Sequence, residues 1–203
     1  MDRIESPLNE RSRRTRAAIL TATWEVLEDE GGRAVSLAEV ARRAGVSRRA
    51  IYLHFGSRSE LITALHEHVD EVLDLQASIE PVLNARDAVT TLDEFAGHLA
   101  RYHPKILAID RAVVHGRRFD PDLAELYERG LAVWRSGCVA IAQRLADEAK
   151  LAAPWTVETA GDMLLALMRD EVVETLVVER GWTEEQHRTL LATLFRRTFV
   201  RSY

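Results

Sequence analysis

The sequence predicts an all-α protein, and three observations carry that prediction. Apolar residues recur at spacings of three and four along most of the chain, and capping signals precede several of these stretches. No stretch alternates apolar and polar residues as a half-buried strand would. We expect about nine helices in two domains, residues 1–60 and residues 61–203.

Composition agrees with a soluble protein that has a charged surface and a sizeable core. Of the 203 residues, 47% are hydrophobic, and the formal net charge is −5. Residues 1–60 hold 11 Arg and 9 acidic residues, a net charge of +2, so the acidic excess lies in the second domain. Cys138 is the only cysteine, which excludes an intrachain disulfide, and no signal peptide or membrane-spanning stretch is evident. We therefore expect a cytoplasmic protein.

The first four helices are bounded by local signals. The first is expected to run from residue 9 or 10 to residue 30, where Gly31-Gly32 ends it. Ser36 has the spacing of a capping box for a second helix starting at Leu37, and Ser47 caps a short third helix. Ser57 opens a fourth helix through a second capping box, and this helix is expected to reach about residue 78.

The rest of the chain also has helical spacing. Asp120 followed by Pro121 is a start signal, and Thr183 with Gln186 forms a capping box for the last helix. The expected helices are roughly 87–102, 104–114, 121–150, 157–180 and 184–201.

Residues 36–55 form a helix-turn-helix motif. Two short apolar helices are joined by Ala44-Gly45-Val46, and glycine permits the tight turn between them. The second helix leaves Arg48, Arg49, Tyr52 and Leu53 facing outward. Between residues 39 and 60 there are five arginines and no acidic residue, as a surface that faces phosphate requires.

The segment 13–65 resembles the DNA-binding domain of the TetR/AcrR family. Its strongest element is Ile51-Tyr52-x-His54-Phe55 followed by a basic residue, Arg58. The other matching residues are Ala18-Ile19-Leu20, Gly31, Ser36-Leu37, Val40-Ala41, Ala44-Gly45-Val46-Ser47 and Leu61. The resemblance implies a ligand-responsive transcriptional regulator, for which we expect repression of a palindromic operator bound as a homodimer. It implies neither an enzyme nor a cofactor.

The resemblance also implies roles for single residues. Ser47 and Arg48 are the candidates for reading base edges, since an arginine can hold guanine bidentately. Arg49 and Ala50 depart from the family pattern, and Arg49 adds a charge that could reach the DNA. The implied DNA-binding residues are Ser36, Ser47, Arg48, Arg49, Tyr52, His54 and Arg58.

The second domain is expected to dimerise and to bind an effector. The family pattern places the dimer interface on the last two helices, and we expect Leu191 to face the partner subunit. A small, largely apolar effector would lie among the central helices. His98 and Tyr102, four residues apart, share a helix face there, with His103 near them. The candidate ligand-binding residues are His98, Tyr102, Arg111, His115, Trp134, Cys138 and Met168.

Alternatives remain at this stage. The same fold could serve a DNA-bound structural or protein-recruiting factor without a small-molecule inducer. Each candidate ligand-binding residue could instead be an ordinary core or surface residue, and the apolar helices could belong to a monomeric core. The spacing of His98, His103 and His115 does not stack two histidines on one helix face, so we predict no metal site.

Overall fold

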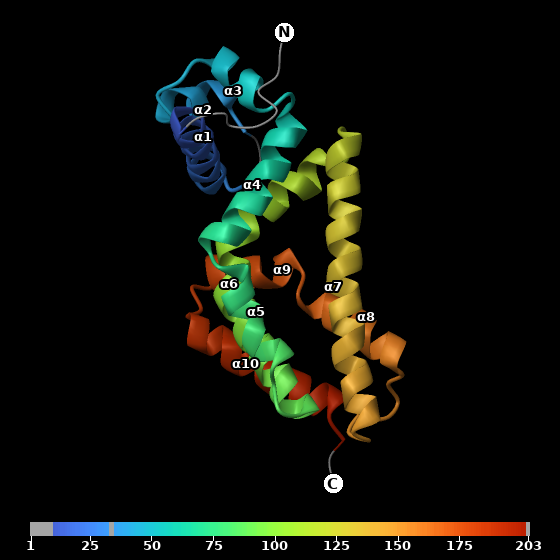
Figure 1. The fold of residues 1–203 in the computed structure, drawn as a ribbon. Helices are drawn as coiled ribbons and strands as arrows, with labels where there is room; N and C mark the ends of the chain where they lie inside the picture. The colour runs from blue at the N-terminus through green and yellow to red at the C-terminus, as the bar shows by residue number, and fades with distance from the viewer. Residues whose placement is uncertain (1–9, 33–34, 202–203) are drawn as a thin grey trace. The chain divides into compact units, whose positions relative to one another are not determined.

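The computed structural model describes residues 10–32 and 35–201, and their regular elements are all helical (Figure 1). The all-α prediction is confirmed. None of the helices in this described part has the length and apolar character needed to cross a membrane. In chain order the elements are α1 (Glu10–Asp29), α2 (Leu37–Arg43), α3 (Arg48–His54), α4 (Arg58–Val72), α5 (Leu75–Leu83), α6 (Ala88–Gly116), α7 (Pro121–Asp147), α8 (Val157–Leu167), α9 (Asp170–Val173), the π-helical segment η1 (Glu174–Glu179) and α10 (Glu184–Phe199).

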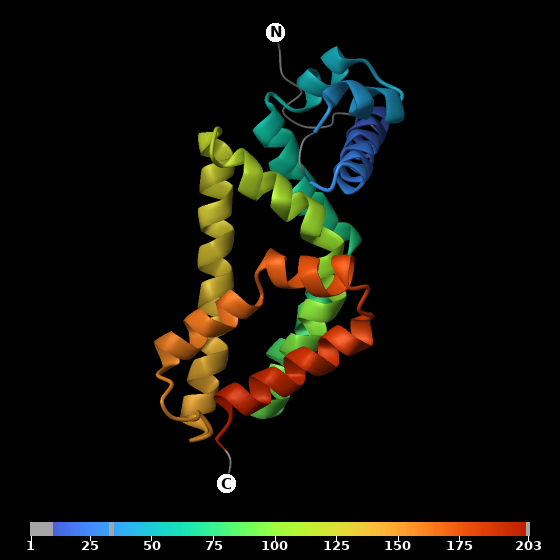
Figure 2. The same cartoon turned by 180° about the vertical axis from the view of Figure 1, so that it is seen from behind.

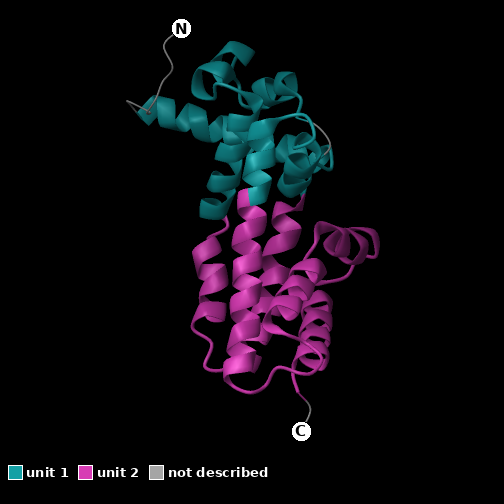
Figure 3. Ribbon diagram, turned by 90° about the vertical axis from the view of Figure 1, so that its right-hand side faces the viewer, with its two compact units in different colours: residues 1–72, 108–128 teal, residues 73–107, 129–203 magenta. Residues whose placement is uncertain are grey.

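The helices form two compact units (Figure 3). The first contains residues up to 72 together with 108–128, and the second contains 73–107 together with 129–203. Helices α6 and α7 each contribute one part to each unit. The predicted domain boundary after residue 60 separates the expected DNA-binding residues from the rest of the chain, and it stays a prediction.

The first unit is built around one apolar face of α1. Ile19 and Leu27 on this helix are fully buried, and so is Phe55, which follows α3. The buried residues of α1 recur at spacings of three and four and form one stripe, which packs against α2 and α4. The expected N-terminal helices and their ends at Gly31-Gly32 and Gly45 are confirmed.

Gly32 is required at the end of α1 for two reasons. Its φ of +74° lies in the left-handed region that side-chain-bearing residues rarely adopt. A Cβ atom on Gly32 would also lie 2.5 Å from the carbonyl oxygen of Ala108 and 2.6 Å from Cβ of Arg111. Because a backbone carbonyl cannot yield like a flexible side chain, glycine here lets α1 end directly against α6.

The second unit has its own core, drawn from α5, α6, α7, α8 and α10. Leu92 and Leu145 are fully buried in it, and Phe95 stacks on Phe195 at 6.0 Å between ring centroids. Polar groups at the margin of this core form hydrogen bonds with helix ends. The Glu148 carboxylate accepts a hydrogen bond from the backbone N–H of Ala88, and so satisfies a free donor at the start of α6.

Two expected helices prove to be divided differently from the prediction. The fourth helix ends at Val72 rather than near residue 78, and α5 starts afresh after Asp74. Asp74 adopts a left-handed φ of 49° and accepts a hydrogen bond from Ala77 N, so it caps α5. Pro81 lies inside α5 instead of beyond the helix end.

The expected helices 87–102 and 104–114 are one continuous helix, α6, with Pro104 in its interior. A proline inside a helix costs about 3 kcal/mol, because it removes one hydrogen bond and crowds the preceding turn. The flanking residues Tyr102, His103, Ile106 and Leu107 are all buried. Their packing keeps the helix continuous across the proline.

The expected helix 157–180 is interrupted. Helix α8 ends at Leu167, Arg169 adopts an extended conformation, and α9 and η1 follow (Figure 2). Neither glycine nor proline marks this break. Gly181 closes η1 with a φ of +67°, and Thr183 with Gln186 forms the predicted capping box of α10.

Candidate nucleic-acid interface

Two serine caps position the helix-turn-helix. Ser36 accepts a hydrogen bond from Glu39 N at the start of α2, and Ser47 accepts one from Ala50 N at the start of α3. Gly45, with a φ of +65°, makes the turn between these helices. Both caps match the predicted positions, and both serines remain exposed at the first turn of their helices.

Helix α3 buries one face and presents the other. Ile51 is buried in the first unit, whereas Arg48 and Arg49 are exposed and 41% of Tyr52 is accessible. Within residues 10–32 and 35–201, neither arginine forms an ion pair. The outward face of α3 therefore carries two uncompensated positive charges beside an exposed aromatic ring.

The arginines of α2 differ from those of α3. Arg42 and Arg43 both donate hydrogen bonds to Glu39, and Arg43 also reaches Asp29 on α1 at 2.7 Å. These bonds lower the pKa of Glu39 to about 2. The positive charges of Arg42 and Arg43 are thus largely compensated within the unit. Arg48, Arg49 and Arg58 supply the uncompensated positive charge of the motif.

Arg16 braces the end of α3 from α1. Its guanidinium lies 4.3 Å from the centroid of the Phe55 ring and donates to the backbone carbonyl of His54 at 3.3 Å. Burial and the Arg16 charge lower the pKa of His54, so its ring is neutral at pH 7. If His54 meets a phosphate, it can offer an N–H donor but no charge.

Helix α4 starts with a modified capping box. Ser57 Oγ accepts from Glu60 N as predicted, but the Glu60 carboxylate accepts from Gly56 N rather than from Ser57 N. Arg58, the first residue of α4, is exposed and forms no ion pair with the described residues. Its position beside free helix N–H groups suits a phosphate contact.

The first unit holds α4 against α6 and α7 through polar contacts that the sequence did not reveal. Ser59 donates to Asp122 at 3.1 Å. The ring of His66 lies 3.6 Å from Asp70 and 3.7 Å from Asp110, and hydrogen bonds to these carboxylates raise the pKa of His66 to about 10. Since Asp110 is 44 residues away, no local pattern pointed to it.

The structure brings several predicted ligand-binding residues together in the second unit. The His98 ring stacks on Tyr102 at 5.4 Å and on Trp134 at 5.9 Å between centroids, and His103 meets the edge of Trp134 at 5.2 Å. We call these four residues the aromatic cluster. Next to it in the same core, Cys138 Sγ lies 3.7 Å from Met168 Sδ, and burial raises the pKa of Cys138 to about 12.

Two predicted ligand-binding residues lie elsewhere. Arg111 belongs to the first unit, where its guanidinium donates to the carbonyl of Gly31 at 3.5 Å. His115 also belongs to the first unit, is exposed, and packs on Phe119. Both lie in the second half of α6, which the prediction had treated as a separate helix after Pro104. The sequence did not show that this half belongs to a different unit from His98.

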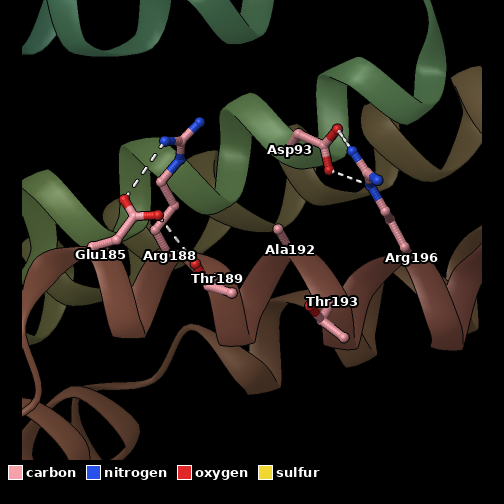
Figure 4. A pocket seen from close by; sticks show the side chains of 7 residues that line it. All are labelled: Asp93, Glu185, Arg188, Thr189, Ala192, Thr193 and Arg196. Carbon is pink, nitrogen blue, oxygen red and sulfur yellow. Dashed lines mark hydrogen bonds and ion pairs between the residues drawn. The ribbon is translucent and has the colours of Figure 1, made fainter.

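A surface groove of about 310 Å³ lies along α10 (Figure 4). Its charges are compensated, because Arg196 pairs with Asp93 and Arg188 with Glu185. None of the predicted ligand-binding residues lines it. The lining residues are Asp93, Glu185, Arg188, Thr189, Ala192, Thr193 and Arg196.

The expectation that Leu191 faces a partner subunit is wrong. Leu191 is 2% exposed and packs in the core of its own subunit. The neighbouring Leu190 and Leu194, four residues apart on one face of α10, are each 36% exposed. On α8, Met163 is likewise exposed.

Residues 19–65 match the profile of the family described as "Bacterial regulatory proteins, tetR family". The regulator TtgR of Pseudomonas putida is 32% identical over 80 residues, which cover 36% of this chain and 38% of TtgR. The repressor BepR of Brucella suis is 27% identical over 177 residues, which cover 83% of each chain. The first curated relatives are thus matched over about two fifths of their length.

Solved structures share the fold well beyond the matched N-terminal segment. A putative transcriptional regulator from Saccharomonospora viridis, in complex with choline, aligns with a TM-score of 0.78 at 16% identity. The alignment covers 94% of this chain and all of that one. At this identity the likeness concerns the fold alone.

Proposed function

This chain belongs to the TetR family of bacterial regulatory proteins, and we propose that it is a ligand-responsive repressor that binds a palindromic operator as a homodimer. A small, largely apolar effector bound in the second unit would release the operator. The relative BepR is named as a transcriptional repressor, which supports repression as the outcome of binding.

One observation carries the DNA-binding part of this proposal. Helix α3 presents Arg48, Arg49 and Tyr52 outward, while Ile51 anchors its opposite face in the unit. A helix held in this way can enter the major groove as a rigid body. Free arginines at its N-terminal end suit guanine, whereas Arg58 on α4 suits the phosphate backbone.

The dimer would use the exposed apolar side chains Leu190 and Leu194 of α10, with Met163 of α8. A twofold dimer places two recognition helices about 34–36 Å apart, in successive major grooves on one face of the DNA. The operator should therefore be palindromic.

The effector would act through its different affinity for two arrangements of the protein. A coupling of about 1–3 kcal/mol weakens DNA binding roughly 5–150-fold, and operator DNA must weaken effector binding by the same factor. The structure of similar fold that contains choline supports a small-molecule effector in this protein as well.

The test is selection of binding sites from random double-stranded DNA with the purified full chain. We expect a palindromic consensus, and Arg48→Ala should cost about 1–3 kcal/mol and relax one symmetric pair of positions. Arg42→Ala is the matched control, because it removes an exposed arginine of α2 that is paired with Glu39 on the same helix. It should leave the consensus unchanged.

Three outcomes would contradict parts of the proposal. Selection that yields no consensus would refute specific operator binding. A consensus that survives Arg48→Ala intact would make Arg48 a backbone contact. Specific binding that no small molecule alters would favour a DNA-bound structural or protein-recruiting factor of the same fold.

A further inference from the structure

Three histidines in the second unit carry buried ring nitrogens without a hydrogen-bond partner among the described residues. They are Nε2 of His98, Nε2 of His103 and Nδ1 of His187. The three side chains are 0%, 7% and 1% exposed. His187 lies close enough to His103 to lower its pKa electrostatically, so these nitrogens belong to one region. A buried polar atom without a hydrogen-bond partner lowers the stability of the folded protein, so a partner for these nitrogens is expected.

Contacts on the other side of two rings favour one position for the ring proton. His98 Nδ1 lies 2.9 Å from Ser78 Oγ, and a hydrogen bond to the Ser78 backbone favours a protonated ring nitrogen there. The Met168 backbone likewise favours a protonated nitrogen in the His103 ring. Because Nε2 is unpaired in both rings, we assign the proton to Nδ1, which leaves each Nε2 with an acceptor lone pair.

The aromatic cluster around these acceptors carries no charge of its own, and the cationic Arg101, which donates to the Ser78 carbonyl, lies close enough to lower the pKa of His98. Burial lowers the pKa of His98 to about 4 and that of His103 to about 3, so both rings are neutral at pH 7. The aromatic cluster contributes no carboxylate, and Trp134, its half-buried member, touches both histidine rings. An anion would meet lone pairs, and a cation would find no counter-charge in the cluster.

No metal ion explains the arrangement. Across the described parts of the chain, no group of three or more His, Cys, Asp or Glu residues is placed to hold one. The ring centroids of His98 and His103 are 6.4 Å apart, with the planes nearly perpendicular. The unpaired nitrogens are therefore better matched by separate hydrogen-bond donors than by one shared ion.

We propose that the effector is an uncharged, largely aromatic molecule with a hydroxyl or N–H group, and that it donates a hydrogen bond to Nε2 of His98 or His103 beside Trp134. This inference rests on the proposed function, which places an effector in the second unit. It adds a polar requirement to an otherwise apolar ligand. A molecule of the same shape without the donor would leave the histidine acceptors unpaired and would bind less tightly.

Matched probe pairs test this requirement on the full wild-type chain. The pairs are phenol and anisole, 2-naphthol and 2-methoxynaphthalene, and indole and 1-methylindole, with binding measured by calorimetry. Methylation removes the donor and makes the probe more apolar. We expect the donor of at least one pair to bind about tenfold more tightly than its methylated partner. A purely apolar site predicts the reverse order.

Variants and imidazole ¹⁵N spectra locate the effect. His98→Phe or His103→Phe, whichever replaces the accepting ring, should bring the donor preference close to one, and His115→Phe, which changes an exposed histidine of the first unit, should preserve it. In the wild-type chain, the Nε2 resonances of His98 or His103 should shift with the donor probe and stay unchanged with its methylated partner. The spectra require no variant to fold.

The outcomes separate this inference from the proposed function. If methylated probes bind as tightly as donors and release the selected operator, the ligand response stands and the donor requirement is refuted. If no probe binds while operator selection succeeds, the inference is also refuted, and buried water becomes the partner of the histidines. A donor preference that persists in both histidine variants would place the donor elsewhere.

Discussion

Acidification from pH 7 to pH 5 should destabilise the second unit through its buried histidines. Burial lowers the pKa of His98 to about 4 and that of His103 to about 3, and it also lowers the pKa of His187. An unfolded histidine titrates near 6.5. Below that pH these histidines bind protons in the unfolded chain but not in the folded chain. The stabilisation that depends on their neutral form is therefore complete above pH 6.5 and declines as the pH falls.

The magnitude follows from the difference in bound protons. Each histidine that stays neutral in the folded chain loses about 1.36 kcal/mol per pH unit below 6.5, which gives about 2 kcal/mol at pH 5. His98 and His103 together account for about 4 kcal/mol. Since a domain is typically stable by about 5–15 kcal/mol, this loss should be obvious in an unfolding experiment.

Urea denaturation at fixed protein concentration, followed by circular dichroism between pH 5 and pH 7.5, measures the effect. The informative quantity is the slope of unfolding free energy against pH. His103→Gln cannot titrate and should lower that slope by about 1 kcal/mol per pH unit below pH 6.5. His115→Gln, at an exposed position, should leave it unchanged. Equal slopes for wild type and His103→Gln would refute the reasoning.

Three further outcomes are expected. Gly32→Ala should destabilise the protein by about 3 kcal/mol or more, because it combines a left-handed φ with a backbone clash. Gly31→Ala, where φ is also positive but the space around the new Cβ is open, should cost about 1 kcal/mol. Thermal unfolding compares the two variants, and equal losses of stability would contradict the clash. Leu194→Glu should shift the sedimentation equilibrium toward monomer more than Thr193→Glu does, and a wild-type monomer at every concentration would exclude the dimer. Arg58→Ala should weaken binding to specific and random DNA by similar factors and make the salt dependence shallower; a loss confined to specific DNA would assign Arg58 to base reading.

Local signals account for the parts of the fold that were predicted correctly. The caps at Ser36, Ser47 and Thr183 and the turn at Gly45 each depend on residues within four positions, so the sequence contains them whole. The pairing of Arg42 and Arg43 with Glu39 is also local, at i+3 and i+4 spacing, and that spacing could have been used to set these arginines apart from Arg48.

The errors in the fold arise where distant contacts decide the local conformation. Pro104 is a strong helix-breaking signal, yet burial of the residues around it keeps α6 continuous. The end of α8 at Leu167 has no sequence signal, and the Met168 backbone that follows it lies close enough to act on the His103 ring, 65 residues earlier in the chain. Such contacts exist only after the helices have packed.

The candidate sites show the same division. Outward residues of α3 follow from helical periodicity, so Arg48, Arg49 and Tyr52 were found on an exposed face. Apolar periodicity cannot distinguish a side chain buried in its own subunit from one that meets a partner, and Leu191 was misplaced for that reason. The unpaired histidine nitrogens depend on the directions of individual side chains, which no spacing records.

The discontinuity of the first unit has a consequence for protein synthesis. Its helix-turn-helix leaves the ribosome early, but residues 108–128, which provide Ala108 beside Gly32, Asp110 beside His66 and Asp122 beside Ser59, come later. The 56 residues of the segment 73–128 must be added first, which takes roughly 3–11 s at the usual rate of translation. During that interval Gly32, His66 and Ser59 lack these partners, and a ribosome stalled before residue 108 would hold the nascent DNA-binding helices without their support.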